Sequence, residues 1–320
     1  MVMARKNTRW CDEATLSKDI RGRVYIVTGA NSGVGLETVR QLVKQGGHVV
    51  MACRRVQAGK VAADSFAGLS GSHEVLACDL ADLQSVRGFV NAFLAKHDRL
   101  DGLVCNAGAV VMGGSAQRSK DGFELTMAAS FFGHFLMTEL LLDVLRESAP
   151  SRMAILSSVV HAGNSKSRPR VNFDDLDWKK RRYSAFAAYA EAKVACVLYA
   201  KELADRLEHT RVAAFSIHPG WARSNFGGNG LLMRAIRIAL LPIRSMITDS
   251  NEASAQTSLY CMLSDEALRH SGAYFSQSSV LYRDRQCRDG GWPLQTLNPN
   301  ADDMDAAKKL VAISRELVGL

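Results

Sequence analysis

The sequence predicts a single-domain α/β fold built on a doubly wound parallel sheet. Short apolar strands alternate with helical segments along the chain. No internal repeat, low-complexity tract or Pro/Ser-rich linker divides the 320 residues, and a hydrophobic content of 47% is enough for a sizeable core. We therefore expect one domain over residues 21–320, with an N-terminal tail over residues 1–20 that drapes over it.

The first predicted strand, residues 24–27, ends in a glycine-rich turn that leads into a predicted helix over residues 36–45. Gly29 lets the chain turn sharply after the strand. Gly33 and Gly35 let the backbone and the helix N-terminus approach a pyrophosphate, whose charge the helix dipole favours. The spacing T-G-x-x-x-G-x-G differs from the commoner G-x-G-x-x-G, and the alternative is a structural turn without a ligand. The strand, turn and helix together predict dinucleotide binding in a Rossmann fold.

A second motif, Tyr189-Ala190-Glu191-Ala192-Lys193, lies downstream of the glycine turn, and Tyr189 is the only tyrosine followed by a lysine four residues later. When hydride from a nicotinamide reaches a carbonyl carbon, the oxygen needs a proton, which a positioned tyrosine can donate. Lys193 lies one helical turn away, so we expect it to stabilise the phenolate and lower the tyrosine pKa from its usual value of about 10. The ordered pair of motifs indicates nicotinamide-dependent redox chemistry.

Three further segments follow predicted strands in an order found in a known family. They are Asp79-Leu80 after strand 73–78, Asn106-Ala107-Gly108 after strand 103–105, and His218-Pro219-Gly220 after strand 212–217. From about residue 22 to the C-terminus, the chain resembles the short-chain dehydrogenase/reductase family. Within that family, the segments 50–54, 133–136 and 314–320 resemble the branch of retinol dehydrogenases and light-dependent protochlorophyllide reductases, which acts on large apolar substrates.

The resemblance implies a catalytic set of Ser158, Tyr189, Lys193 and Ser130. Ser158, at the end of a predicted strand, matches the family serine that holds the substrate oxygen, and Ser157 is its structural neighbour. Lys193 is implied to bind the nicotinamide ribose. Ser130 stands where the family pattern N-x-x-G-H-F has the asparagine that helps to hold a water behind the lysine, so the relay is altered here.

The resemblance also implies a cofactor site assembled from several loops. Its expected residues are Gly29, Asn31, Ser32, Gly33, Val34, Gly35, Arg54, Asp79, Leu80, Asn106, Ala107, Gly108, Tyr189, Lys193, Pro219, Gly220 and Ser224. The family usually has a threonine at the position of Ser224, and the hydroxyl is retained.

The end of the second predicted strand bears on the choice between NAD and NADP. Sites that prefer NAD usually place a carboxylate there to bind the ribose 2′-hydroxyl, whereas this chain has Cys53-Arg54-Arg55. An arginine suits a 2′-phosphate because its guanidinium makes forked, charge-assisted hydrogen bonds. We therefore expect NADP, with solvated loop charges as the alternative interpretation of the two arginines.

Thirty residues separate Ser158 from Tyr189, and a long connection beside a site is typical of a binding loop. We interpret His161, within this insertion, as a packing or solvent-facing residue and not as a second acid/base group. Protochlorophyllide reductases have a cysteine two residues after the catalytic lysine. This chain has Ala195 there and Cys196 one position later, which favours carbonyl/alcohol redox over light-dependent ring reduction.

The segment after the sixth strand, about residues 222–250, is predicted to form a substrate lid. It is apolar, with glycines as hinge points, and would favour an apolar substrate. Arg234, Arg237 and Arg244 offer a contact to a membrane surface, and these charges also make the segment unfit to span a bilayer. The alternative is that its apolar residues pack on the core or in a homo-oligomer contact.

The composition excludes several other classes of protein. The net charge is +8, but the basic residues are dispersed, so we expect a solvated basic face and no nucleic-acid partner. The N-terminus lacks an apolar run after its charges, so neither a signal peptide nor a transmembrane segment is expected. The seven cysteines lack C-x-x-C spacing, which predicts a reducing, cytoplasmic location with neither disulfides nor zinc and no other metal.

These observations predict an NADP-dependent oxidoreductase that transfers hydride between the nicotinamide and a carbonyl or alcohol of a fairly large apolar substrate, such as a retinoid, a steroid or a lipid aldehyde. Two alternatives stay open. One is a catalytically weak NADP-binding sensor or scaffold protein, which only Ser130 supports, and the other is a protochlorophyllide-type C=C reductase.

Overall fold

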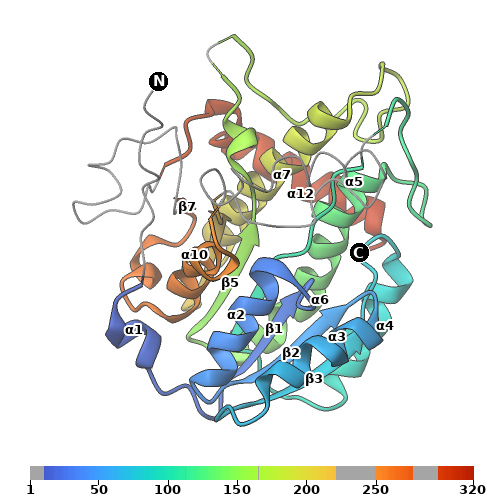
Figure 1. Cartoon of the computed structure of the whole chain (residues 1–320). Coiled ribbons are helices and arrows are strands. Elements are labelled where there is room, and N and C mark those ends of the chain that lie inside the picture. The colour runs from blue at the N-terminus through green and yellow to red at the C-terminus, as the bar shows by residue number, and fades with distance from the viewer. Residues whose placement is uncertain (1–10, 112, 165, 221–248, 277–294) are drawn as a thin grey trace, which may run out of the picture.

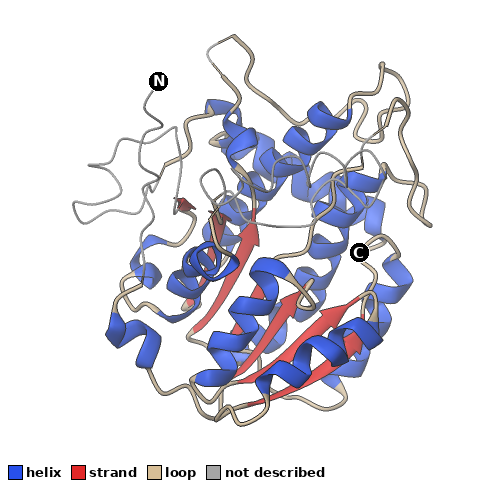
Figure 2. Ribbon diagram, in the orientation of Figure 1, coloured by secondary structure: helices blue, strands red, loops and turns tan. Residues whose placement is uncertain are grey.

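The computed structural model describes residues 11–111, 113–164, 166–220, 249–276 and 295–320. Its centre is a seven-stranded sheet in the order β3-β2-β1-β4-β5-β6-β7, in which every neighbouring pair is parallel (Figures 1 and 2). The strands are β1 (Val24–Thr28), β2 (His48–Cys53), β3 (Ser72–Ala77), β4 (Gly102–Cys105), β5 (Ser151–Leu156), β6 (Val212–His218) and β7 (Tyr274–Ser276). The expected doubly wound parallel sheet is therefore confirmed.

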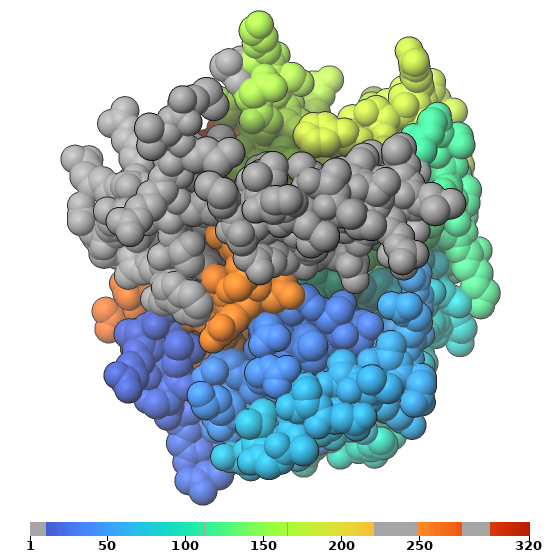
Figure 3. Space-filling view, in the orientation of Figure 1, coloured from blue at the N-terminus to red at the C-terminus, as the bar shows by residue number. Residues whose placement is uncertain are grey.

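Helices cover both faces of this sheet. In the described residues they are α1 (Glu13–Ser17), α2 (Gly33–Lys44), α3 (Val56–Ala63), α4 (Leu83–Leu94), α5 (Leu125–Met127), α6 (Gly133–Glu147), α7 (Ala185–Arg206), α10 (Asn251–Leu263) and α12 (Met304–Val318). Helices α2 and α10 pack side by side on one face, where their blue and orange surfaces adjoin (Figure 3). Helices α4, α6 and α7 cover the other face, and α12 packs against α7 (Figure 1). Strands β5 and β6 are buried at every position, as expected for a parallel sheet covered on both sides.

The element boundaries follow the sequence-based expectations closely, with one informative difference. Helix α2 begins at Gly33, three residues before the expected start, because the glycine turn itself forms the first helical turn. The N–H of Leu36 donates to the carbonyl oxygen of Ser32 at 3.3 Å. Glycine has a low helix propensity, which is why the sequence pattern placed the start too late.

The described part of the expected N-terminal tail lies on the domain. Asp12 caps α1, and the backbone N–H of Cys11 donates to Oε1 of Gln256 on α10 at 3.1 Å. Ile20 is buried in the core beside α2. Residues 1–10 and all but the end of the expected lid, residues 221–248, lie outside the described residues.

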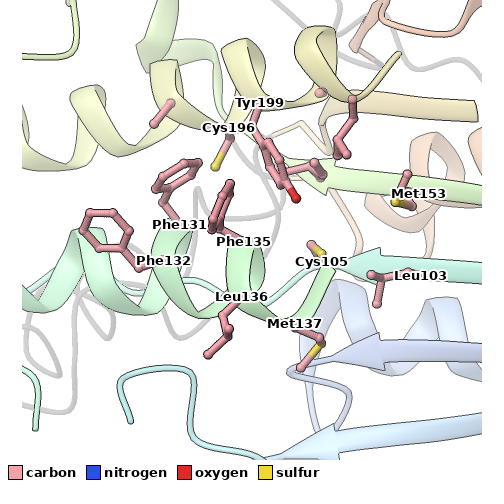
Figure 4. Packing of buried hydrophobic residues seen from close by; sticks show 14 of the residues in the cluster. Leu103, Cys105, Phe131, Phe132, Phe135, Leu136, Met137, Met153, Cys196 and Tyr199 are labelled. Atoms are coloured by element: carbon pink, nitrogen blue, oxygen red, sulfur yellow. The ribbon is translucent and has the colours of Figure 1, made fainter. Parts of the chain in front are cut away.

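Helix α6 is the apolar centre of the second layer, and it packs against α7. Figure 4 shows Phe131, Phe135 and Tyr199 gathered between the two helices, and the rings of Phe135 and Tyr199 are 4.8 Å apart. The hydroxyl of Tyr199 donates to Glu139 at 2.8 Å, and Arg206 donates to the same carboxylate at 2.6 Å. Because α7 carries Tyr189 and Lys193, these contacts fix where the expected catalytic side chains lie.

The stretch Leu125–Glu147, which includes α6, is the one helix in the described residues that is long and apolar enough to cross a membrane. Its most apolar window is 78% buried inside the protein. A buried core helix has this same length and composition, so the stretch is weak evidence for a membrane span.

Two glycines in helices provide a matched test of packing. A methyl group on Gly133 would collide with the carbonyl oxygen of Leu80, whereas a methyl group on Gly88, on the exposed side of α4, meets nothing within 4 Å. We expect Gly133→Ala to lower the free energy of unfolding by about 1–3 kcal/mol, because the close contact between α6 and the loop after β3 must open. Gly88→Ala should raise it by up to about 1 kcal/mol through helix propensity. Urea denaturation measures both values, and equal effects would contradict the close approach at Gly133.

Candidate active site

The carboxyl ends of β1 and β4 form the centre of the candidate site. The strand order reverses between them, and in an open α/β sheet a ligand crevice forms at such a point. The side-chain amide of Asn106 donates to the carbonyl oxygen of Thr28 at 2.8 Å, and the N–H of Ala107 donates to Oγ1 of Thr28 at 2.9 Å. These bonds hold the expected Asn106-Ala107-Gly108 segment against the glycine turn.

The glycine turn has the geometry that a pyrophosphate requires. Gly29 and Gly33 adopt positive φ angles of 63° and 60°, and the space beside Gly33 is open. Gly35 is crowded instead, since a Cβ there would lie 2.7 Å from the carbonyl oxygen of Gly29. Ser32 makes no side-chain cap to α2, although Asp82, Ser184 and Asp303 cap their own helices. Among the residues that the structure describes, no side chain accepts from the first N–H groups of α2, which fits an anionic ligand at this end.

The expected adenine-side residues lie beside this turn. The N–H of Gly29, in the turn, donates to the carbonyl oxygen of Ala52 in β2 at 3.0 Å, so Arg54, two residues later, begins close to the turn. Arg54 is exposed. The carboxylate of Asp79 accepts from the N–H of Ala81 at 3.0 Å, and Leu80 is buried.

The expected catalytic side chains come together at the ends of β5 and α7. Tyr189 is 9% exposed, and the side chain of Ser158 lies close enough to lower the pKa of its hydroxyl. The ammonium of Lys193 donates to the carbonyl oxygen of Leu156 at 2.7 Å and lies 5.5 Å from the centre of the Tyr189 ring. Ser157 is turned away from this group, because its hydroxyl donates to the carbonyl oxygen of Lys193 at 2.7 Å. The structure thus distinguishes the two serines.

Burial has the largest effect on the two ionisable catalytic groups. It raises the pKa of Tyr189 above its ordinary value, and the hydrogen bond from Ser158 opposes this by lowering the pKa. Burial also lowers the pKa of Lys193. The spacing of Tyr189 and Lys193 predicts a lowered tyrosine pKa, whereas the net shift is upward because desolvation has the largest effect.

Ser130 lies among these groups, in a π-helical segment (Ala128–Phe132) that precedes α6. Such segments are frequent at functional sites. The hydroxyl of Ser130 lies 3.4 Å from both the backbone nitrogen and the carbonyl oxygen of Ala109. A Cβ placed on Gly108 would be 3.5 Å from the Ser130 hydroxyl and 3.5 Å from the Lys193 ammonium. Ser130 and Lys193 therefore both lie beside Gly108.

Three buried histidines surround the site, and burial lowers the pKa of each. The pKa falls to about 3 for His134, to about 4 for His161 and to about 3 for His218. His161 is held between the carbonyl oxygen of Ser158 and the hydroxyl of Thr296, each at 2.6 Å. It is a packed residue and does not face solvent. Because all three are neutral near pH 7, none is a protonated acid there.

The insertion between Ser158 and Tyr189 is anchored to the catalytic helix by an ion pair that the sequence analysis missed. Arg181 makes a two-pronged contact with Glu191, at 2.8 and 2.7 Å, and stacks 3.7 Å from the ring of Trp178. Asp175 accepts from the N–H groups of residues 179 and 180 and so closes the loop. Glu191 lies between Tyr189 and Lys193 in the sequence. No helical or strand periodicity connects it with Arg181, so the sequence pattern could not reveal the contact.

The last two parts of the expected site are the loop that follows β6 and the lid. Pro219 and Gly220 follow β6, with Gly220 at a positive φ of 87°. Ser224 and the apolar lid residues lie outside the described residues.

A Rossmann sheet whose glycine turn can accept a phosphate, with a serine, a tyrosine and a lysine close together at the same edge, is typical of nicotinamide-dependent oxidoreductases, because hydride transfer and proton transfer must occur at one place. Comparison with known proteins supports the same class. The family model described as short chain dehydrogenase matches residues 23–168. Retinol dehydrogenase 13 from Homo sapiens is 37% identical over 305 residues, which cover 94% of this chain and 86% of that protein. Retinol dehydrogenase 12 from Mus musculus is 36% identical and covers 96% of this chain and 89% of its own length.

A solved structure of an uncharacterised protein from Mycobacterium paratuberculosis has a TM-score of 0.71 and 29% sequence identity, and it covers 94% of this chain and 95% of its own. The chain belongs to the short-chain dehydrogenase family, in the branch that resembles retinol dehydrogenases. It is an oxidoreductase that uses a nicotinamide cofactor.

The Arg181–Glu191 pair generates a stability prediction. Glu191 is almost fully buried, so Arg181→Met would leave its carboxylate without a partner and should lower the free energy of unfolding by about 2 kcal/mol. Adding Glu191→Gln should restore part of this loss, because the unpaired charge is removed. Arg182→Met, at the exposed neighbouring position, is the control and should have little effect. Thermal and urea denaturation test the cycle, and strictly additive losses would show that the pair is not coupled.

Proposed function

We propose that the protein is an NADP-dependent carbonyl reductase or alcohol dehydrogenase for a fairly large apolar substrate. The observation that carries the proposal is the position of the buried Tyr189, with Lys193 5.5 Å from its ring, Ser158 close enough to act on its hydroxyl, and the glycine turn at the same edge of the sheet. The site residues hold the groups that carbonyl reduction requires: a proton donor, a second hydroxyl to orient the oxygen, and a cation.

The residues have separate roles in this mechanism. Bound nicotinamide supplies the hydride or accepts it. Ser158 orients the substrate oxygen, and Tyr189 gives that oxygen its proton, or removes the proton when an alcohol is oxidised. Lys193 keeps a positive charge near the tyrosine, which opposes the cost of forming a buried phenolate. Ser130 is proposed to hold water behind Lys193, in place of the longer asparagine side chain.

The cofactor would lie across the carboxyl edge of the sheet. The free N–H groups at the start of α2, with Gly33 and Gly35, suit its pyrophosphate, and Asp79 with Leu80 would border the adenine. Arg54, exposed beside the turn, is proposed to bind the 2′-phosphate. The other residues of the expected cofactor set are proposed to contact the cofactor as well.

The substrate class rests on the relatives. Two similar proteins are named retinol dehydrogenases, and retinol is a large apolar alcohol. We propose the same chemical class here, with the segment after β6 as the lid. A cytoplasmic location, peripheral contact with a membrane and homo-oligomer formation remain part of the proposal.

A weakly catalytic NADP-binding sensor or scaffold is the second candidate, because Ser130 replaces the asparagine of the relay. The protochlorophyllide-type reaction is less well supported. Cys196 is fully buried, and its thiol donates to the carbonyl oxygen of Ser130 at 3.5 Å. It is engaged with the helix before α6, where it cannot donate a proton to a substrate.

The assignment of the proton donor is tested by Tyr189→Phe. This change removes only the hydroxyl, so NADPH binding should persist while turnover of an aldehyde substrate falls by about 100-fold or more. NADPH absorbance measures the rate, and fluorescence titration measures the binding. Tyr183→Phe is the control, because Tyr183 lies in the insertion and donates to Glu124 at 3.0 Å. Near-normal turnover by Tyr189→Phe would end the assignment, and a wild-type protein without turnover on any aldehyde, ketone or alcohol would favour the sensor.

The cofactor preference is tested by Arg54→Ala. Removing a charge-assisted contact worth about 1.5–3 kcal/mol should weaken NADPH binding by tenfold or more and leave NADH binding nearly unchanged. Arg55→Ala, the matched neighbour, should have the smaller effect. Equal losses for the two cofactors in Arg54→Ala would place this arginine away from the 2′-phosphate.

A further inference from the structure

A cluster of metal-ligating side chains lies at the amino end of the sheet, opposite the catalytic edge. His48 is the first residue of β2, Glu74 lies in the neighbouring edge strand β3, and His97 follows α4. One ligand atom from each of the three side chains lies within 4.8 Å of the other two. Two imidazoles and a carboxylate are ligands that Zn²⁺ prefers.

The distances within the cluster suit a small cation. Nε2 of His97 lies 2.6 Å from Oε1 of Glu74, and Nε2 of His48 lies 3.9 Å from the same oxygen. Tetrahedral zinc with bonds of 2.0–2.1 Å separates two ligand atoms by about 3.3 Å. The two observed distances lie on either side of this value, so small side-chain rotations would bring the ligands into place. The proton that His97 Nε2 shares with Glu74 would leave to solvent, or move to Nδ1, when the metal binds.

A second observation points to a ligand at the same place. Nε2 of His48 is buried and makes no hydrogen bond with any residue that the structure describes. Its other ring nitrogen, Nδ1, is 2.7 Å from the hydroxyl of Ser72. When Nδ1 donates this hydrogen bond, Nε2 carries a free lone pair that faces the cluster. Metal-binding histidines typically use the second ring nitrogen in this way, because the bond fixes the orientation of the ring.

Neighbouring side chains contact two of the three ligands, His97 and Glu74. Phe93 packs against the ring of His97, with centroids 5.0 Å apart. Lys96 donates to Oε2 of Glu74 at 2.7 Å and leaves Oε1 for the cation. The three ligand side chains are 17–27% exposed, so the cluster lies near the protein surface.

We propose that His48, Glu74 and His97 bind one Zn²⁺ ion, which fastens the edge strand β3 to β2 and to the end of α4. The ion would stabilise the fold from the end of the sheet that is remote from the hydride-transfer site. Without a metal, the cluster is a hydrogen bond between His97 and Glu74 with His48 beside it.

The full-length protein is stripped of metal and titrated with Zn²⁺ by calorimetry. We expect one ion per chain with a Kd of about 10 μM or tighter. His48→Gln, Glu74→Gln and His97→Gln should each weaken binding by tenfold or more. His73→Gln is the matched control, because it lies next to Glu74 on β3 but its side chain points to the other face, where it packs on Phe66. It should bind zinc as the wild type does.

Thermal unfolding provides a second measurement that does not depend on activity. Saturating Zn²⁺ should raise the Tm of the wild type and of His73→Gln by about 3 °C or more, and should not raise it in the three ligand variants. Circular dichroism without metal verifies that each variant is folded. Weaker zinc binding than about 10 μM by the wild type, or equal binding by wild type and ligand variants, would overturn the proposal.

Discussion

The junction between the ends of β1 and β4 is the constraint on which the candidate site depends. Asn106 and Ala107 both bond to Thr28, across a separation of more than seventy residues in the sequence. The glycine turn lies against Asn106 and Ala107, and the next residue, Gly108, lies beside the Lys193 ammonium and the Ser130 hydroxyl. A side chain on Gly35 would collide with both Asn106 and Gly29, so the junction also explains why the turn needs glycine there. Loss of this junction would separate the cofactor end of the site from the catalytic end.

Local patterns were sufficient to predict the sheet and the order of its motifs, because each strand is a short apolar run and each functional segment follows one. The parallel sheet then brings all those segments to one edge without further information. The start of α2 was missed by three residues, since glycine weakens the helical pattern. The Arg181–Glu191 contact was not predicted either. It depends on the path of a thirty-residue insertion, and its two partners have no helical or strand spacing.

The spacing of Tyr189 and Lys193 predicted their proximity but not the balance of forces on the tyrosine. A neighbouring lysine lowers the pKa of a tyrosine, because its positive charge stabilises the phenolate. Burial disfavours the phenolate, and it raises the pKa of Tyr189 here. A tyrosine with its ordinary pKa of about 10 is already protonated at neutral pH, and burial strengthens that preference. The same group can donate a proton to a new alkoxide or, as the phenolate, accept one from an alcohol, so it serves both directions of a redox reaction.

The sequence predicts no metal site. The cluster of His48, Glu74 and His97 shows why such a site cannot be recognised from the sequence alone. That expectation considered the spacing of the cysteines, which indeed do not form a zinc motif. The three other ligands are far apart in the chain and come together only because β3 pairs with β2 and α4 returns to the same end of the sheet. A site made by pairing register leaves no short motif, so only the fold reveals it. Its place on the edge strand also gives it a physical purpose, because an edge strand is held by one neighbour only and gains most from an additional link.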